Sequence, residues 1–150
     1  MIKVYMDVCC LNRPFNDHTQ DRVRLESEAV LIVLTHIEQE EWLGVSSEAV
    51  EFEIDNDTNS DRRTEIQNLD NQSQKFVVIE NDQEARALEL QNYGFGAFDA
   101  LHVACAEYAG ADVLLTVDDR FLRIAKRLQN SLAVRIANPV VWLMEVLDND

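Results

Sequence analysis

Five short apolar runs are separated by longer stretches with helical periodicity, and this alternation leaves few folds open. The runs cover residues 2–6, 42–46, 76–79, 112–117 and 133–136. Strands that alternate with helices are typical of a parallel sheet with helices on both faces. We therefore predict an α/β fold, a three-layer α/β/α sandwich with a mostly parallel central sheet of four or five strands.

The stretches between these runs place apolar residues on one side of a helix. The predicted helices cover residues 21–41, 48–57, 62–71, 83–93, 98–109, 119–129 and 140–147. Ser47 is expected to cap the second of them, and Gly94 and Gly110 to end the fourth and fifth. Residues 7–17 are expected to form an irregular loop, because Arg13-Pro14 opposes an early helix. The run at 76–79 is expected to be a buried strand.

Composition limits the kinds of partner. With 150 residues and no repeat or linker, the chain is expected to form a single domain over residues 1–150. Its net charge of −15 opposes nucleic acid and anionic membranes unless a metal or a basic patch intervenes. Three cysteines without a CxxC pattern favour a reducing compartment, and no leader or membrane-spanning run is apparent. We expect a cytoplasmic protein without a membrane partner.

Three aspartates stand where a strand ends or a helix begins. Asp7 ends the first run, Asp118 follows the run at 112–117, and Asp99 opens the helix just upstream. Ligands of parallel α/β sheets bind beyond the carboxyl ends of the strands, near the point where strand order reverses. Carboxylates that converge there typically hold a divalent metal. The competing interpretation is scattered surface charge, since the chain has 28 Asp and Glu residues.

Three segments carry a resemblance to a known family. They are MDVCCLN at 6–12, FDALHVACA at 98–106 and TVD at 116–118. Together they resemble the PIN-domain family, which includes the VapC-like toxins of bacterial toxin–antitoxin pairs, and the resemblance covers essentially the whole chain. It implies metal-dependent RNA cleavage by three or four acids. By position these acids are Asp7, Asp99, Asp118 and one glutamate on the helix after the second strand.

That glutamate is Glu48, Glu51 or Glu53. The family spacing favours Glu53, which lies about six residues after the serines that end the strand. On a helix, Glu48 and Glu51 lie about 140° and about 160° around the axis from Glu53, so only one region of the helix can face the site. The other glutamates are expected to be solvated helix charges.

The resemblance implies a set of roles for these acids. Asp7, Glu53, Asp99 and Asp118 would be catalytic, and the three aspartates would hold Mg²⁺ or Mn²⁺. Both ions prefer oxygen ligands, and they can neutralise a scissile phosphate and activate water. The predicted function is an endoribonuclease of the toxin type, with RNA as substrate and a small antitoxin protein as partner, and with a homodimer left open. The alternative is a PIN-fold interaction or regulatory protein with little or no activity.

Four further residues are candidates for supporting roles near the metal or the substrate. Thr116 can orient a carboxylate through its hydroxyl, and Asn12 is either a turn residue or a polar contact near the metal. Arg120 and Arg123 share a helix face with Arg127. This arginine strip is either a phosphate-binding surface or a solvated face that balances the acids.

Other residues near the acids are expected to be structural. Asp119 is expected to cap the helix that follows it. His102 lies three residues after Asp99 and is expected to pack rather than to catalyse. Cys9 and Cys10 are expected to be small buried side chains, because no other Cys or His spacing supports a zinc site.

Overall fold

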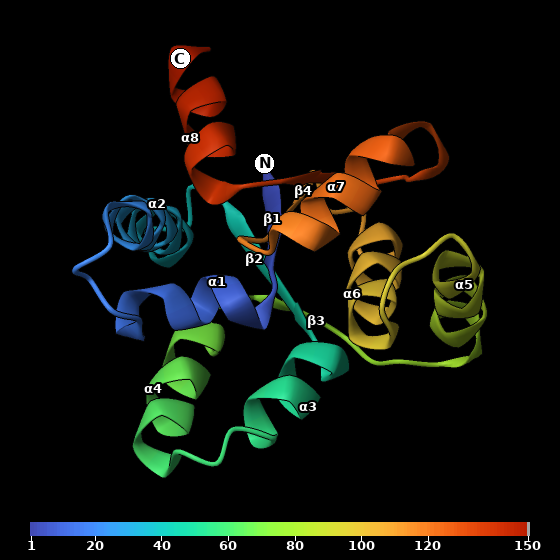
Figure 1. The fold of residues 1–150 in the computed structure, drawn as a ribbon, viewed down its shortest axis with the longest axis horizontal. Coiled ribbons are helices and arrows are strands. Elements are labelled where there is room, and N and C mark those ends of the chain that lie inside the picture. The colour runs from blue at the N-terminus through green and yellow to red at the C-terminus, as the bar shows by residue number, and fades with distance from the viewer. Residues whose placement is uncertain (150) are drawn as a thin grey trace.

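A computed structural model describes residues 1–149, with a five-stranded parallel sheet at its centre (Figure 1). The strands are β1 (Lys3–Met6), β2 (Leu43–Ser47), β3 (Lys75–Val77), β4 (Val113–Leu115) and β5 (Arg135–Ala137). Every neighbouring pair is parallel, and the order across the sheet is β3-β2-β1-β4-β5. The predicted α/β fold with a mostly parallel sheet is confirmed.

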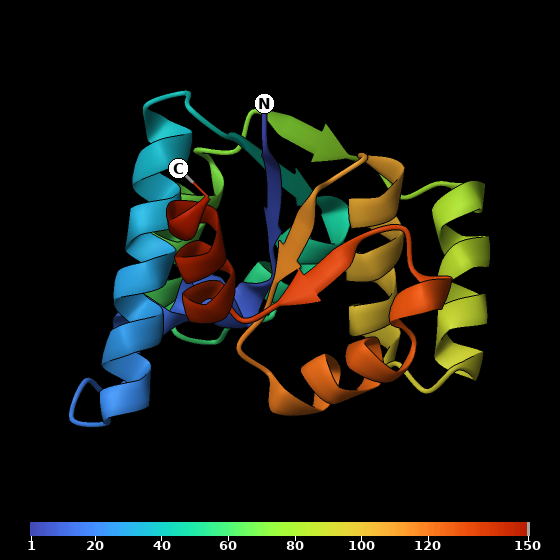
Figure 2. The ribbon, with the colours of Figure 1, turned by 90° about the horizontal axis from the view of Figure 1, so that it is seen from above.

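Helices cover both faces of this sheet. They are α1 (Val8–Asn12), α2 (Asp21–Glu38), α3 (Glu48–Asp55), α4 (Ser60–Asp70), α5 (Asn81–Asn92), α6 (Ala97–Tyr108), α7 (Asp119–Arg127) and α8 (Pro139–Asp148), with 3-10 turns η1 (Arg13–Phe15) and η2 (Gln129–Ser131). Helices α2 and α8 lie side by side on one face, and α5 and α6 pair on the other (Figures 1 and 2). Within residues 1–149, no helix is long and apolar enough to cross a membrane.

The strand order reverses at the centre of the sheet. From β1 the chain moves outward to β2 and β3, and it then returns to the other side of β1 to form β4 and β5. The Asp7 N–H donates to the Leu115 carbonyl at 3.2 Å, so β1 and β4 are still joined where both strands end. The reversal therefore lies between β1 and β4, where α/β sheets of this kind bind ligands.

The central strands are buried on both sides. In β4, Val113, Leu114 and Leu115 are all fully buried, as is Tyr5 in β1. A parallel strand covered by helices on both faces has no solvent side, which explains why these runs are apolar without alternation.

Residues 7–17 do not form the predicted loop. The Asp7 side chain caps α1 by accepting the Cys10 N–H at 3.1 Å, and α1 runs directly into η1. Pro14 lies in the first turn of η1, where backbone N–H groups have no partner within the helix, so its missing N–H costs no hydrogen bond. The prediction was wrong because proline stops a helix only beyond its first turn.

The run at 76–79 was also predicted incorrectly as a buried strand. β3 is an edge strand with β2 as its one neighbour, and only Val77 of its residues is buried. Phe76 is 47% exposed, and Val78, just beyond the strand, is 51% exposed. An apolar run of this length does not by itself distinguish an edge strand from a central one.

Three of the predicted helix ends, at Ser47, Gly94 and Gly110, are confirmed. The Ser47 hydroxyl accepts the Val50 N–H at 3.4 Å and caps α3. Gly94 and Gly110 follow α5 and α6 with φ of 115° and 68°, a backbone conformation that favours glycine over residues with a side chain.

Candidate active site

The first acid, Asp7, stands where β1 ends and α1 begins. Its carboxylate is buried and accepts hydrogen bonds from the Cys10 N–H at 3.1 Å and from the Cys9 thiol at 2.9 Å. Burial raises the pKa of Asp7 well above its ordinary value, and the neighbouring Cys9 adds to this effect. A buried carboxylate in this position favours the approach of a cation.

Asp118 occupies the corresponding position at the start of α7. Its Oδ1 accepts the N–H groups of Arg120 at 2.9 Å and Phe121 at 3.2 Å. Oδ2 makes no hydrogen bond within residues 1–149, so one oxygen of this exposed carboxylate faces solvent without a partner. Asp118 thus has both a capping role and an oxygen available to a ligand.

Asp119 does not cap this helix, contrary to prediction. Asp118 has extended backbone angles and fills the cap position, so Asp119 is already the first helical residue. Its carboxylate instead makes two hydrogen bonds of 2.8 Å to Arg22 on α2. The pairing of Asp119 with a distant helix has no local signal in the sequence.

Asp99 lies in the first turn of α6 and links the other acids electrostatically. Burial raises its pKa to about 6, and the Asp7 carboxylate contributes to the rise. His102 opposes the shift, while Asp118 and Glu53 add to it. The four predicted acids are therefore close to one another: Asp7, Asp118 and Glu53 all raise the pKa of Asp99.

Glu53 reaches this group through a hydrogen-bonded chain of buried side chains. Its carboxylate is hydrogen bonded to His102 Nε2, and His102 Nδ1 lies 2.6 Å from the Tyr5 hydroxyl. The Tyr5 hydroxyl in turn lies 2.7 Å from the Ser47 hydroxyl. This network joins α3 and α6 to β1 and β2, and it fixes the direction in which Glu53 points.

The other two glutamates of α3 point elsewhere. Glu48 accepts the Ile79 N–H at 2.7 Å, so the expectation that it is a solvated charge is wrong. Glu51 lines a separate pocket with Asp70. Of the three glutamates, only Glu53 is among the charges that act on Asp99.

The fully buried His102 packs in the core as expected, but its hydrogen bonds were not foreseen. His102→Ala is expected to lower the free energy of unfolding by about 2–4 kcal/mol, because it leaves a cavity and removes one hydrogen bond each from Tyr5 and Glu53. Urea unfolding tests this, with the exposed His18→Ala as control, which should stay within about 0.5 kcal/mol of wild type. A loss below about 1 kcal/mol for His102→Ala would contradict a stabilising network.

Thr116 and Cys9 support the acids from the end of β4 and from α1. The buried Thr116 hydroxyl accepts the Asp118 N–H at 3.2 Å and lies 3.3 Å from the Cys9 sulfur. Cys9 is half-buried and donates to Asp7, a contact that sequence analysis missed; Cys10 is buried as expected. Asn12 Oδ1 is buried and has no hydrogen-bond partner within residues 1–149.

The arginine strip (Arg120, Arg123 and Arg127) lines a shallow hollow of about 460 Å³ together with Gly94. Arg120 and Arg123 are exposed, and in the described part of the chain neither forms an ion pair. Asp118 caps the helix that carries them, so the strip starts two residues after this acid. In a chain this acidic, they form a local surface suited to phosphate.

Arg22 is a further residue that sequence analysis missed. It donates to Asp119, to the Val117 carbonyl at 3.2 Å and to Glu26 at 3.1 Å. The buried Glu26 also accepts from Arg13 at 2.8 Å. This ion-pair network joins the segment between β4 and α7 to α2 and so holds Asp118 in place. The sequence indicates only one of its contacts, through the i, i+4 spacing of Arg22 and Glu26.

The donor set suits a hard divalent cation. Within residues 1–149, no three His, Cys, Asp or Glu side chains are placed to hold one ion together. Mg²⁺, however, usually binds through one or two carboxylates and keeps several waters. The buried carboxylate of Asp7, the raised pKa of Asp99 and the free Oδ2 of Asp118 fit such an ion.

The pKa of Asp99 leads to a prediction for the metal-free protein. Its value is about 6 in the fold against 3.8 ordinarily, so the folded state binds this proton more tightly than the unfolded chain. Stability due to Asp99 is greatest below about pH 4, falls as pH rises to about 6, and then stays level. Allowing for its partial exposure, the expected loss is about 1–2 kcal/mol.

Urea unfolding in EDTA at about pH 4.5 and about pH 7.5 measures this loss. The difference between the two pH values should be smaller in Asp99→Asn than in wild type. Equal differences would show that the carboxylate of Asp99 titrates normally in the fold.

The protein is thus an α/β/α sandwich. Its candidate acids lie beyond the carboxyl ends of β1 and β4, where the strand order reverses. The family model of the PIN domain matches residues 4–127, so the chain belongs to the PIN-domain family, which confirms the resemblance noted in the sequence.

Comparison with solved structures gives the same fold. A chain of the crystal structure of VapBC2 from Rickettsia felis, bound to a DNA fragment from their promoter, is similar with a TM-score of 0.52 and 12% sequence identity. The similarity covers 92% of this chain and 98% of that chain. No curated protein sequence matches the chain.

Proposed function

We propose that this protein is a metal-dependent endoribonuclease, the toxin of a toxin–antitoxin pair. The observation that carries the proposal is the position of Asp7 and Asp118 just beyond β1 and β4, the two strands between which the strand order reverses. The raised pKa of Asp99, which Asp7, Asp118 and Glu53 all increase, supports it. Carboxylates that raise one another's pKa at the ligand-binding edge of a parallel sheet are typical of a functional site. Family membership favours nuclease chemistry for this one.

In this proposal Asp7, Asp99 and Asp118 would hold Mg²⁺ or Mn²⁺, one or two of them directly and the rest through water that the ion keeps. When bound, the ion supplies charge neutralisation at the scissile phosphate and lowers the pKa of water. The protein supplies the position of the carboxylates: Asp7 is fixed by α1, and Asp118 by its cap and by Thr116. Glu53, oriented by His102, would accept a proton or hold water beside the acids.

The arginine strip supports RNA as substrate despite the net charge of −15. Guanidinium groups bind phosphate oxygens in pairs of hydrogen bonds, and such contacts position a nucleic acid without reading its bases. Arg120 and Arg123 would therefore orient the RNA backbone, with Asn12 as a further polar contact. The chemistry would take place at the acids beside them.

The net charge also supports a basic protein partner. The structural neighbour from Rickettsia felis is a VapBC2 complex, which favours a small antitoxin as the partner proposed for this chain.

The test is incubation of the purified protein with a panel of single-stranded RNAs in Mn²⁺, with excess EDTA as control. We expect cleavage in Mn²⁺ and none in EDTA. A folded protein that cuts nothing in the panel would favour the alternative function, an interaction protein without activity. Cleavage that survives EDTA would contradict the metal-dependent mechanism.

A further inference from the structure

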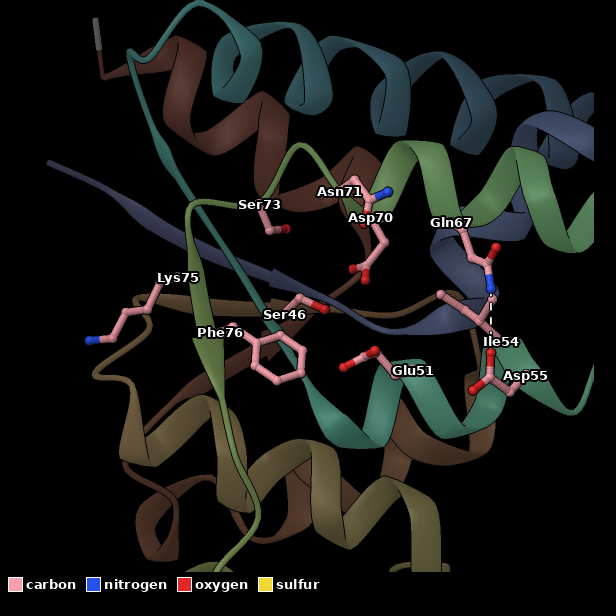
Figure 3. Close-up of a pocket in the computed structure, with 10 residues that line it drawn as sticks. All are labelled: Ser46, Glu51, Ile54, Asp55, Gln67, Asp70, Asn71, Ser73, Lys75 and Phe76. Carbon is pink, nitrogen blue, oxygen red and sulfur yellow. Dashed lines mark hydrogen bonds between the residues drawn. The ribbon is translucent and has the colours of Figure 1, made fainter.

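A second acidic pocket lies between helices α3 and α4 and strands β2 and β3, and Figure 3 shows the side chains that line it. Its volume is about 380 Å³, within the range of small-molecule sites. The pocket is distinct from the candidate active site, since none of the four candidate acids lines it. A ligand can therefore bind in this pocket whether or not the protein cleaves RNA.

The pocket carries negative charge that the protein does not neutralise. Glu51, Asp55 and Asp70 line it, and within residues 1–149 none of them forms an ion pair. Lys75 is the one basic residue in the lining. Its ammonium group donates to the Ala109 carbonyl at 3.1 Å and points away from the carboxylates (Figure 3).

The Ser46 hydroxyl is the second observation that points to a ligand. Ser46 is 3% exposed, and its Oγ has no hydrogen-bond partner in the described part of the chain. In Figure 3 this oxygen points between the carboxylates of Glu51 and Asp70. Burial raises the pKa of Asp70, and the nearby Ser46 hydroxyl lowers it. The geometry between the two groups is nevertheless not that of a hydrogen bond. A buried hydroxyl without a partner is destabilising, so a donor from outside the protein would relieve it.

The rest of the lining suggests the shape of that donor. Phe76 is 47% exposed and its ring lies beside Ser46, while Ile54 adds an apolar surface. A guanidinium group is flat, donates up to five hydrogen bonds in its plane, and packs its faces on aromatic rings. Acceptors beside an aromatic ring match both properties, because the charge meets carboxylates while the flat face meets carbon.

We propose that this pocket binds a guanidinium group, with Glu51, Asp70 and Ser46 as acceptors and Phe76 as the stacking surface. The group can belong to a free small molecule or to an arginine side chain of a partner protein. The chemistry of recognition is the same in both cases.

Titration of ¹⁵N-labelled protein with butylguanidine, in EDTA, tests the proposal. The backbone signals of Ser46, Glu51, Asp70 and Phe76 should shift together and saturate. Butylurea, which has nearly the same shape without the charge, should bind at least about tenfold more weakly. Equal binding of the two compounds, or shifts without saturation, would overturn the proposal.

An arginine tripeptide with blocked ends distinguishes the two sources. Tighter binding of the tripeptide than of butylguanidine would assign the site to a protein partner. Weaker or equal binding would assign it to a free small molecule. If neither probe shifts the pocket signals, the site is not a guanidinium site.

Variants locate the binding. Glu51→Gln changes an exposed residue and should raise the Kd for butylguanidine about tenfold, as should Asp70→Asn if circular dichroism shows that it folds. Glu65→Gln removes the same charge from an exposed position of α4 and should leave the Kd within about twofold. Asp99→Asn should also leave it unchanged. Weakening by Asp99→Asn instead of Glu51→Gln would place the cation at the candidate active site and overturn the proposal.

Discussion

Asp99→Asn is expected to lower the rate of RNA cleavage by about 100- to 1,000-fold while the protein stays folded. The amide keeps the size of the carboxylate but removes the charge that Asp7, Asp118 and Glu53 surround. Asp7→Asn and Asp118→Asn should act similarly, because each removes a charged oxygen from the proposed ion. Of the three variants, Asp118→Asn should disturb folding least, since an asparagine also caps helices.

Glu53→Gln should lower the rate by a comparable factor, and the same helix provides its controls. Glu48→Gln and Glu51→Gln remove the same charge from α3, but neither side chain acts on Asp99. Both should stay within a few-fold of wild type. Initial rates on one RNA substrate in Mn²⁺ measure the effect, with circular dichroism to confirm folding. Retention of wild-type activity by Asp99→Asn, or equal losses in all three glutamate variants, would contradict the proposed site.

Much of the fold could be predicted from local sequence patterns, and the predictions that failed did so for physical reasons. Apolar runs and glycine helix ends fix strands and helices locally, which is why the central strands, Gly94 and Gly110 were predicted. Burial depends also on neighbours that are distant in the chain. Nothing in residues 76–79 reveals that β3 has only one neighbouring strand, so its exposed Phe76 was not expected.

The candidate site shows the same division. The aspartates were recognisable because each stands at a strand end or a helix start, where topology alone brings side chains together. Apart from Thr116, the groups that orient the acids were not recognisable. The chain from Glu53 through His102 to Tyr5 links positions separated by 49 and 97 residues, and Arg22 reaches Asp119 over 97 residues. Such contacts depend on packing, which a single sequence does not display.

Removal of divalent metal is expected to have the second large effect, on stability as well as on activity. A ligand that binds only the folded state stabilises it by about 2.7 kcal/mol at a hundred times its Kd. For a chain of this size, that corresponds to a rise in Tm of about 5–10 °C. Thermal unfolding of the EDTA-treated protein, with and without millimolar Mn²⁺, measures the rise.

Asp99→Asn separates a metal site from general charge screening. Without metal, this variant should be more stable than wild type at neutral pH, because it relieves repulsion among the carboxylates that raise the pKa of Asp99. With Mn²⁺ it should gain much less than wild type, since one ligand is gone. Asp82→Asn, a change at an exposed position of α5, removes the same charge and should respond to Mn²⁺ as wild type does. An equal gain in wild type and Asp99→Asn would show that Mn²⁺ only screens surface charge, and the acids would then have no metal to hold.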